Sequence, residues 1–442
     1  MGIDSMDIKV GLIGLGTIGQ GVVKILREEG EDSHNLIAHL GVPLRLKKIA
    51  DIDLKKAQGL NLPSSMLTTR AEEILQDPEI QIVIELIGGY EPARTFLLQA
   101  LEGGKHVVTA NKALLAKHGE EIFQAAAARQ VDIGFEASVG GGIPIIRAIK
   151  EGLAADHIRS VYGIMNGTAN YILSEMEKEG TSFDSVLKDA QSQGFAEADP
   201  AFDIKGIDTA HKLAILVSLA FGTRISLEQI FTEGIDRITP LDLQFARELG
   251  YKIKLLALAK DVDGEIEARV HPTLLSAGYL LATVAGVYNA IYVVGDRVGS
   301  TMFYGMGAGE RPTACAVVSD VMDIARNIRK NITRRITPTS FCEDYIKEKK
   351  VRDINQIVSS YYLRFFALDK PGVLSKISGI LGQHNISLAS VIQKERRIGE
   401  AVPIVMMTHE ALEHNIQNAL NEINSLPFVT EKANLIRVAK LD

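Results

Sequence analysis

The stretch Ile8-Lys-Val-Gly-Leu-Ile-Gly14-Leu-Gly16-Thr17-Ile18-Gly19 decides the fold of the N-terminal part of the chain. A short apolar segment is followed by a glycine turn, and residues 20–29 then have the pattern of a helix. In this spacing the first glycine makes a tight turn, the second lets the backbone approach a pyrophosphate, and the third permits close helix–strand packing. The helix N-terminus offers free N–H groups to a phosphate. We therefore predict a dinucleotide site that includes Gly14, Gly16, Thr17, Ile18 and Gly19.

Apolar strands alternate with helical segments from this turn as far as residue 135. The continuous apolar run over residues 80–87 is typical of a parallel strand that is buried on both faces. This alternation predicts an α/β fold with a Rossmann-type doubly wound sheet. We expect a dinucleotide-binding domain over residues 1–135, an α+β catalytic and dimerisation domain over 136–330, a polar linker over 331–360 and a separable C-terminal domain over 361–442.

The acid that ends the second predicted strand bears on the choice of cofactor. Asp51, or Asp53 two residues later, stands where an acidic side chain usually binds the adenine ribose 2′-OH. A carboxylate there would repel a 2′-phosphate and favours NAD. Nearby lysines could instead bind that phosphate, so NAD and NADP both stay open; these lysines are Lys47, Lys48, Lys55 and Lys56.

A second polar motif, Thr109-Ala-Asn111-Lys112, directly follows another predicted strand. Ligands of open α/β sheets bind beyond the carboxyl ends of the strands. We expect Thr109 to contact the cofactor and Lys112 to meet both cofactor and substrate, although a lysine at a helix start is often only a surface residue.

Residues 190–212 concentrate acids and a lysine: Glu197, Asp199, Asp203, Asp208 and Lys212. Asp208 and Lys212 are four residues apart on a predicted helix and therefore share one face. Carboxylates can bind an ammonium group, and a nearby lysine can transfer a proton. The alternative is a solvated helix N-terminus with favourable first-turn acids.

The whole segment 190–212 resembles the signature of homoserine dehydrogenases, from Ala190 through Gly194-Phe-Ala196, Asp199-Pro200, Asp203-Ile204 and Gly206 to Asp208 and Lys212. Residues 165–173, 286–290 and 303–309 resemble further segments of that family, so the resemblance covers residues 8 to 330. It implies reversible NAD(P)-dependent interconversion of L-aspartate 4-semialdehyde and L-homoserine in threonine, methionine and isoleucine biosynthesis. Met306 in place of proline and Glu310 in place of a small residue depart from the family pattern.

The resemblance also implies roles for individual residues. Lys212 corresponds to the proton donor and acceptor, and Lys112 to a second lysine at the reacting hydroxyl. The implied substrate residues are Glu197, Asp203, Asp208, Gly167 and Thr168, and Gly307 belongs to the loop that closes on the nicotinamide. A sodium-type cation is implied at the Glu136 side chain and at the carbonyls of Val139, Gly141 and Ile143.

The C-terminal residues 361–442 follow the order strand, helix, strand, strand, helix, strand, with a turn at Gly399. This is the ferredoxin-like βαββαβ order. Asp369-Lys-Pro-Gly372 and Asn385-Ile386 resemble an ACT domain, which implies an amino-acid effector, threonine, near Asp369, Gly372 and Asn385. Such domains pair, so we expect a homodimer or homotetramer; a purely structural pairing module is the alternative.

Composition argues against several other classes of protein. The net charge of −7 does not favour nucleic-acid binding, and the longest apolar stretch, residues 279–294, is short for a membrane span. Asp4 and Asp7 interrupt any signal peptide, and the two cysteines, Cys315 and Cys342, favour a reducing cytoplasm. Two alternative functions are another ACT-bearing NAD-dependent dehydrogenase, acting on a 2-hydroxy acid, and a non-catalytic amino-acid sensor.

Overall fold

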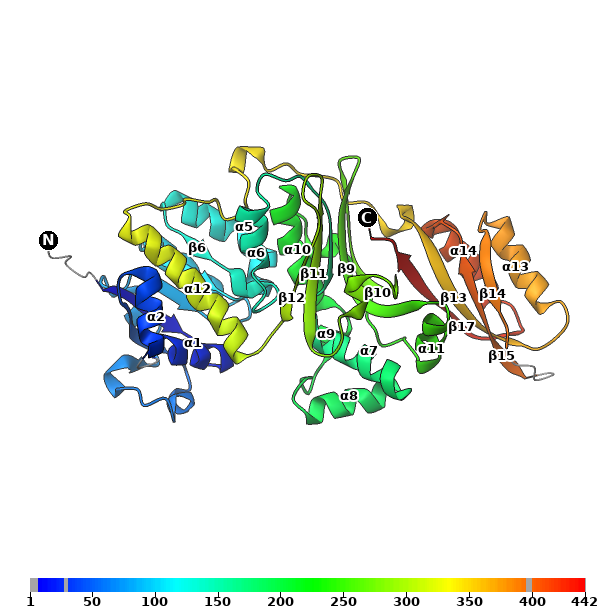
Figure 1. Ribbon diagram of the computed structural model, residues 1–442, viewed down its shortest axis with the longest axis horizontal. Helices are drawn as coiled ribbons and strands as arrows, with labels where there is room; N and C mark the ends of the chain where they lie inside the picture. The colour runs from blue at the N-terminus through cyan, green and yellow to red at the C-terminus, as the bar shows by residue number, and fades with distance from the viewer. Residues whose placement is uncertain (1–6, 28–30, 395–399, 442) are drawn as a thin grey trace.

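The structure, a computed structural model, describes residues 7–27, 31–394 and 400–441. The turn predicted at Gly399 and the aspartate at position 4 lie outside the described residues. Figure 1 shows three parts in a row, with the N-terminal sheet at the left, the middle region in the centre and the βαββαβ unit at the right. None of the helices in the described part of the chain has the length and apolar character needed to span a bilayer.

Six parallel strands form the N-terminal sheet in the order β3-β2-β1-β4-β5-β6, which confirms the predicted doubly wound sheet. The order reverses between β1 and β4, so a ligand-binding crevice is expected beyond the carboxyl ends of these two strands. The strands are β1 (Ile8–Ile13), β2 (Leu44–Ala50), β3 (Leu67–Thr68), β4 (Ile82–Glu85), β5 (His106–Thr109) and β6 (Ile133–Gly134). The helices are α1 (Thr17–Arg27), α2 (Glu31–Leu40), α3 (Glu72–Leu75), α4 (Ala93–Glu102) and α5 (Lys112–Ala128).

Helix α12 (Glu310–Arg329) follows the middle region in the chain but packs on the N-terminal sheet, as Figure 1 shows at the left. Its buried residues Ala314 and Val317 share a hydrophobic cluster with Val10 and Ile84. Gly21 of α1 permits this contact, because a Cβ at that position would lie 2.9 Å from the Cβ of Ala314. The domain limits predicted above stay a proposal, and in space the first domain includes this helix.

The middle region and the C-terminal unit share an eleven-stranded mixed sheet in the order β12-β11-β7-β9-β10-β17-β13-β15-β14, with β8 beside β10 and β16 beside β13. The strands are β7 (Ile158–Ile164), β8 (Phe231–Thr232), β9 (Tyr251–Val262), β10 (Glu265–Ser276), β11 (Tyr288–Gly295), β12 (Gly299–Met306), β13 (Val358–Leu368), β14 (Leu388–Ile392), β15 (Ala401–Thr408), β16 (Ala411–Leu412) and β17 (Val429–Ala439). The remaining α-helices are α6 (Ile145–Arg147), α7 (Gly167–Glu179), α8 (Phe183–Ser192), α9 (Ala201–Ile204), α10 (Ile207–Phe221), α11 (Pro240–Glu248), α13 (Val373–Gln383) and α14 (Glu413–Asn424).

The βαββαβ unit has its own hydrophobic core but is joined firmly to the middle region. Strand β17 pairs in parallel with β10 over three residue pairs, beginning with Thr273 opposite Arg437. Asp242 of α11 is fully buried and accepts hydrogen bonds from Tyr362 Oη at 3.0 Å, Arg364 Nε at 2.7 Å and Asn434 Nδ2 at 2.9 Å. The predicted limits of the C-terminal domain therefore stay a prediction, and the polar connector in sequence does not exclude strand pairing in space.

Candidate active site

The glycine turn after β1 has the geometry predicted for a pyrophosphate site. Gly14 has a φ of +103°, and a Cβ at Gly19 would lie only 2.2 Å from the Gly14 carbonyl oxygen. A Cβ at Gly16 would have no atom within 4 Å, so this glycine borders open space. Thr17 begins α1, with Ile18 in its first turn. The turn therefore leaves room beside a helix N-terminus, which fits a dinucleotide.

Asp51, directly after β2, supports this turn. Its carboxylate accepts hydrogen bonds from Leu15 N at 2.6 Å and Asp53 N at 2.8 Å, and Lys56 Nζ lies 3.1 Å from Oδ1. Burial raises the pKa of Asp51, but these hydrogen bonds and Lys56 outweigh it and lower the pKa below the ordinary value. The charge of Asp51 is thus already shared with the turn and with Lys56, and its contact with a cofactor ribose stays a prediction.

Glu85, which the sequence analysis missed, connects the ends of β4 and β5. It is fully buried and accepts hydrogen bonds from Thr109 Oγ1 at 2.6 Å, Ile87 N at 2.8 Å and Gly88 N at 3.2 Å. Burial raises the pKa of Glu85, and these donors oppose the rise. The signal in the sequence was an acid at the end of an otherwise apolar strand. Glu85 therefore holds the loop after β4 against the end of β5.

Asn111 places Lys112 at the beginning of α5. The Asn111 side chain accepts a hydrogen bond from Leu114 N at 3.1 Å and so caps the helix, while its amide donates to the Gly89 carbonyl at 2.7 Å. This fixes the helix start against the loop that follows β4. Lys112, the first helical residue, then reaches across to the middle region.

Asp208 lies between the two lysines that the sequence analysis singled out. Lys112 Nζ is 3.1 Å from Oδ1, and Lys212 Nζ is 2.7 Å from Oδ2 of the same carboxylate. Lys212 also donates to the Met165 carbonyl at 2.6 Å. The side chain of Lys212 is 10% exposed and that of Lys112 is 34% exposed, so Lys112 is the more open of the two. The structure thus joins a lysine of the first domain to a buried pair on α10.

Burial and neighbouring charges determine the protonation of Asp208 and Lys212. Burial lowers the pKa of Lys212, and the Asp208 carboxylate opposes this by stabilising the ammonium form. Burial would raise the pKa of Asp208, but Lys212 and Lys112 hold it well below the ordinary value. Asp208 is therefore a carboxylate at neutral pH. A buried lysine whose charge is balanced by one acid is suited to give and take a proton.

Asn166 connects this group to Asp203. Its amide nitrogen donates to Asp208 Oδ2 at 2.9 Å and to Asp203 Oδ1 at 2.7 Å. Its amide oxygen accepts from Ala169 N at 2.8 Å and so caps α7. Asn166 lies inside the family-like segment 165–173 but was not predicted as a site residue; its position just before a helix was the available signal.

The other predicted substrate residues differ in their burial and in their contacts. A Cβ at Gly167 would lie 2.9 Å from the Val287 carbonyl oxygen, so only glycine fits there. Thr168 Oγ1 donates to the Phe195 carbonyl at 2.7 Å. Glu197 is exposed in the loop between α8 and α9, and within the described residues its carboxylate has no hydrogen bond or ion pair with the Asp208 group. The substrate role of Glu197 stays a prediction.

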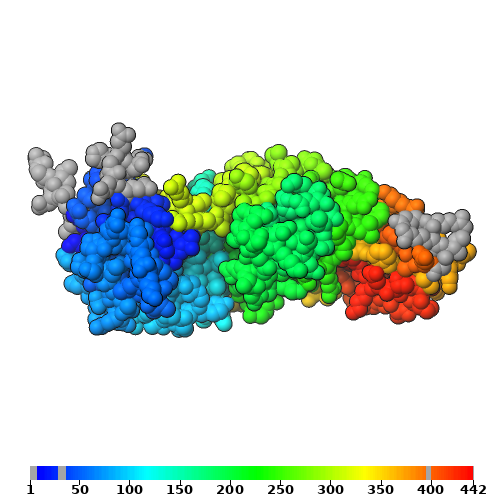
Figure 2. Space-filling view, turned by 90° about the horizontal axis from the view of Figure 1, so that it is seen from below, coloured from blue at the N-terminus to red at the C-terminus, as the bar shows by residue number. Residues whose placement is uncertain are grey.

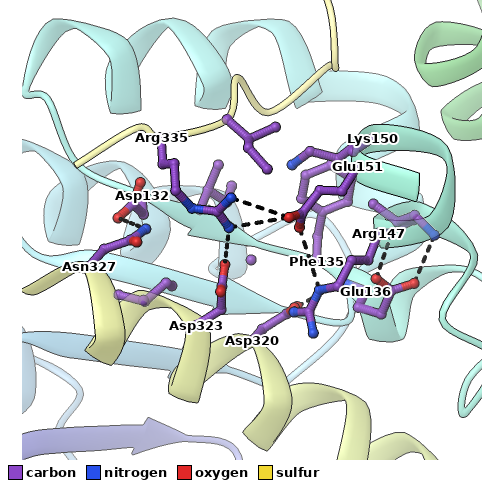
Figure 3. A pocket seen from close by; sticks show the side chains of 15 residues that line it. Asp132, Phe135, Glu136, Arg147, Lys150, Glu151, Asp320, Asp323, Asn327 and Arg335 are labelled. Carbon is purple, nitrogen blue, oxygen red and sulfur yellow. Dashed lines mark hydrogen bonds and ion pairs between the residues drawn. The ribbon is translucent and has the colours of Figure 1, made fainter. Parts of the chain in front are cut away.

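Glu136 lies in a buried pocket between the first domain and the middle region, which Figure 3 shows. Its carboxylate oxygens accept hydrogen bonds from Ile146 N and Arg147 N, each at 2.8 Å. Burial and the neighbouring Asp320 raise the pKa of Glu136 to about 7. Among the described residues no cluster of three or more His, Cys, Asp or Glu side chains could hold a metal ion, so a cation here would depend on backbone carbonyls.

The carbonyls predicted to bind the cation belong to a loop that contacts the predicted nicotinamide loop. A Cβ at Gly141 would lie 2.5 Å from the Gly307 carbonyl oxygen, and Gly142 N donates to the Met306 carbonyl at 3.1 Å. Glu310, one of the two departures from the family pattern, pairs with Lys24 of α1 at 2.6 Å. This ion pair therefore links α12 to α1 of the dinucleotide-binding domain.

The predicted effector residues lie around α13, remote in sequence from the catalytic group. Gly372 has a φ of +89° and precedes α13, and Asn385 follows the helix with a φ of +58°. Asp369 N donates to the Glu400 carbonyl at 2.9 Å. Effector binding at this turn stays a prediction.

Three regions of the chain match known protein families. Residues 14–136 match the NAD binding domain of homoserine dehydrogenase, residues 144–322 match the homoserine dehydrogenase family, and residues 361–428 match the ACT domain. These matches contain the glycine turn, the Asp208 group and the βαββαβ unit.

Individual relatives match over the whole length. A homoserine dehydrogenase of Neisseria gonorrhoeae is 43% identical over 434 residues, which cover 98% of this chain and 99% of that protein. The crystal structure of a homoserine dehydrogenase from Thiobacillus denitrificans has a TM-score of 0.92 and 46% identity, with 98% of each chain covered. A hyperthermophilic archaeal homoserine dehydrogenase in complex with NADPH has a TM-score of 0.60 and 26% identity, with 72% of this chain and 97% of that chain covered.

Proposed function

Because this chain belongs to the homoserine dehydrogenase family, we propose that it interconverts L-aspartate 4-semialdehyde and L-homoserine reversibly. The protein is an NAD(P)-dependent oxidoreductase with an NAD-binding domain and a C-terminal ACT domain. We place the reaction in the biosynthesis of threonine, methionine and isoleucine and keep the cytoplasm as the expected compartment.

The observation that carries the proposal is the single carboxylate of Asp208 held between Lys112 and Lys212. The nicotinamide cofactor, when bound, supplies or accepts the hydride. Lys212 donates a proton from Nζ to the substrate oxygen during reduction and accepts it during oxidation, while Asp208 balances its charge. Lys112, which is the more exposed lysine, orients the same oxygen from the cofactor side.

We propose that the substrate ammonium group is bound by carboxylates on the opposite side of this group. Asp203 is held toward Asp208 by Asn166 and is partly exposed, so it can accept a further donor. Glu197 could approach from its exposed loop when substrate is present. Gly167 and Thr168 shape the neighbouring wall.

One assay tests the proposed reaction against its alternatives. Oxidation of NADH and NADPH is followed with L-aspartate 4-semialdehyde, with a panel of 2-oxo acids and with no added substrate. Turnover with the semialdehyde alone supports the proposal; turnover with a 2-oxo acid favours the 2-hydroxy-acid dehydrogenase, and no turnover favours the amino-acid sensor. Lys212→Ala should lower kcat by about 10²–10⁴-fold, the usual contribution of a general acid–base group. Lys188→Ala is its matched control, because Lys188 is exposed on α8.

We propose that both NAD and NADP serve as cofactors. Lys56 compensates the charge of Asp51, so repulsion of a 2′-phosphate is weakened. We also propose a sodium-type cation bound by Glu136 and by the carbonyls of Val139, Gly141 and Ile143, since hard oxygen ligands suit such an ion. Replacement of sodium by choline in the assay buffer should then lower the activity, and an unchanged rate would contradict the cation.

We also propose that threonine regulates the enzyme and that the chain assembles as a homodimer or homotetramer. The ACT domain supports amino-acid binding as a function of the C-terminal unit. Titration of the activity with threonine tests the effector, and light scattering of the purified protein tests the assembly.

A further inference from the structure

Asn289, near the beginning of β11, carries a buried amide without a hydrogen-bond partner. The residue is 1% exposed, and within the described residues its Oδ1 atom is sealed from solvent and has no donor. Its Nδ2 atom likewise has no acceptor among those residues. Buried polar side-chain atoms in folded proteins nearly always have a partner. A bound molecule is therefore a natural partner for this amide.

Asn289 lies on the sheet between the two parts of the candidate active site. Strand β11 stands between β7 and β12. On the β7 side, Met165 directly follows the strand, and its carbonyl accepts a hydrogen bond from Lys212 Nζ at 2.6 Å. On the β12 side, Asn289 is opposite Gly305, two residues before Gly307. The amide is thus placed between the lysine proposed to transfer the proton and the loop predicted to close on the nicotinamide.

The side chain of Asn289 points to the face of the sheet that carries the catalytic helix. Side chains two residues apart on a strand share one face, and Ile291 belongs to the same hydrophobic cluster as Leu213 of α10. Gly307 packs directly on the amide, since a Cβ at Gly307 would overlap the side chain of Asn289. Glycine at this position therefore leaves the amide uncovered by a side chain of that loop. Figure 2 shows a recess between the blue and cyan surface of the first domain and the green surface of the middle region.

The chemistry of an amide selects among the groups that could bind there. Asn289 offers an acceptor and an NH₂ donor side by side. A monovalent cation would satisfy Oδ1 but would leave Nδ2 facing a positive charge. The reacting oxygen of the substrate is already assigned to Lys112 and Lys212. The carboxamide of a nicotinamide ring carries one NH₂ donor and one carbonyl acceptor, so it can pair with both atoms of Asn289.

We propose that Asn289 binds the carboxamide of the nicotinamide ring, with Oδ1 accepting from the carboxamide nitrogen and Nδ2 donating to the carboxamide oxygen. The inference rests on the proposed function, because it requires a nicotinamide cofactor beside Lys212. This pairing fixes the rotation of the ring about its bond to the ribose. It therefore determines which face of the ring is turned toward the substrate, and such orientation is a large part of enzymatic rate enhancement.

A cofactor analogue tests the contact without relying on turnover. The dissociation constants of NAD and of its 3-acetylpyridine analogue, in which a methyl ketone replaces the carboxamide, are measured by calorimetry, and the NADP pair is treated likewise. The analogue keeps the carbonyl acceptor but lacks the NH₂ donor. The variants are Asn289→Leu and Asn289→Ala, which both remove the amide. Asn418→Leu is the control, because Asn418 is exposed on α14. Homoserine oxidation is followed with the same preparations.

The wild type and Asn418→Leu should bind the analogue about 5–100-fold more weakly than the natural cofactor, because a buried acceptor is left without its donor. In both Asn289 variants the natural cofactor should bind more weakly, and the ratio should fall to about 2-fold or less, since the two changes remove the same contact. Equal binding of cofactor and analogue by the wild type, as expected if water satisfied the amide, would overturn the proposal. A ratio that persists in the Asn289 variants would do the same.

The same measurements distinguish failure of this contact from failure of the proposed function. A wild-type protein that discriminates against the analogue but does not oxidise homoserine would overturn the proposed function and leave the Asn289 contact intact. A wild-type protein that oxidises homoserine but binds cofactor and analogue equally would overturn the contact alone.

Discussion

Replacement of Asp208 by asparagine should move the pH dependence of the reaction toward lower pH. The substitution keeps the shape of the side chain but removes the charge that stabilises the ammonium form of Lys212. The pKa of Lys212, already lowered by burial, should therefore fall further. Oxidation of homoserine needs the neutral amine, so its rate rises with pH through this pKa. Reduction of the semialdehyde needs the ammonium form, so its rate falls as the pH rises through the same pKa. The pH–rate profiles of both reactions should therefore shift together.

The size of the shift follows from the separation of the two charges. Lys212 Nζ and Asp208 Oδ2 are 2.7 Å apart. At an effective dielectric constant of about 20, unit charges at this distance interact by roughly 6 kcal/mol, an upper limit of about 4 pKa units. A single opposite charge in proteins usually shifts a pKa by about 1–3 units. We therefore expect the limb to move by about 1–3 pH units, together with a lower plateau, because an amide cannot balance two ammonium groups.

The assay is the pH profile of kcat for homoserine oxidation and for semialdehyde reduction. Asp199→Asn is the matched control, since Asp199 belongs to the same segment but is exposed and, among the described residues, accepts a hydrogen bond only from the backbone of Ala201. The control should keep the wild-type limb. A limb at the wild-type pH in Asp208→Asn would refute the reasoning, because the group that transfers the proton would then not depend on this carboxylate.

Three further changes test other parts of the structure. Asp51→Ser should raise the ratio of kcat/KM for NADP to that for NAD. It should also weaken the binding of both cofactors, because the glycine turn loses a hydrogen-bond acceptor. An unchanged ratio would show that Asp51 does not determine the choice of cofactor. Glu85→Ala should lower kcat by up to about 10²-fold through misplaced loops, and steady-state rates equal to those of the wild type would contradict that positioning role. Asp242→Ala breaks a buried ion pair and should cost about 3–5 kcal/mol, so a free energy of unfolding in urea within about 1 kcal/mol of the wild type would count against the junction.

Local patterns in the sequence predicted the parts of the structure that depend on neighbouring residues. The glycine turn at residues 14–19 and the pair of Asp208 and Lys212 depend on spacing within one turn or helix, so both could be predicted. The return of α12 to the first sheet and the pairing of β10 with β17 join residues far apart in the chain. No spacing rule relates such residues, so these contacts required the structure.

The roles of Glu85 and Asn166 were missed for a related reason. Each side chain acts by joining segments that are distant in sequence: Glu85 holds residues of two neighbouring strand ends, and Asn166 holds Asp203 and Asp208 together. A lone acid after an apolar strand and an asparagine before a helix both have common structural explanations, in particular helix capping. Their hydrogen-bond partners distinguish them from residues that only end an element.

The continuous sheet determines how regulation can be examined. Deletion of residues 361–442 would remove the partner strand of β10 and leave Asp242 buried without Arg364. An unpaired buried charge is strongly destabilising, so a truncated enzyme would lose effector binding and the integrity of the middle region together. Weakened activity after deletion would therefore say little about an effector. Substitutions that remove only exposed side chains keep the sheet and the buried ion pairs, and can separate binding of a regulator from support of the fold.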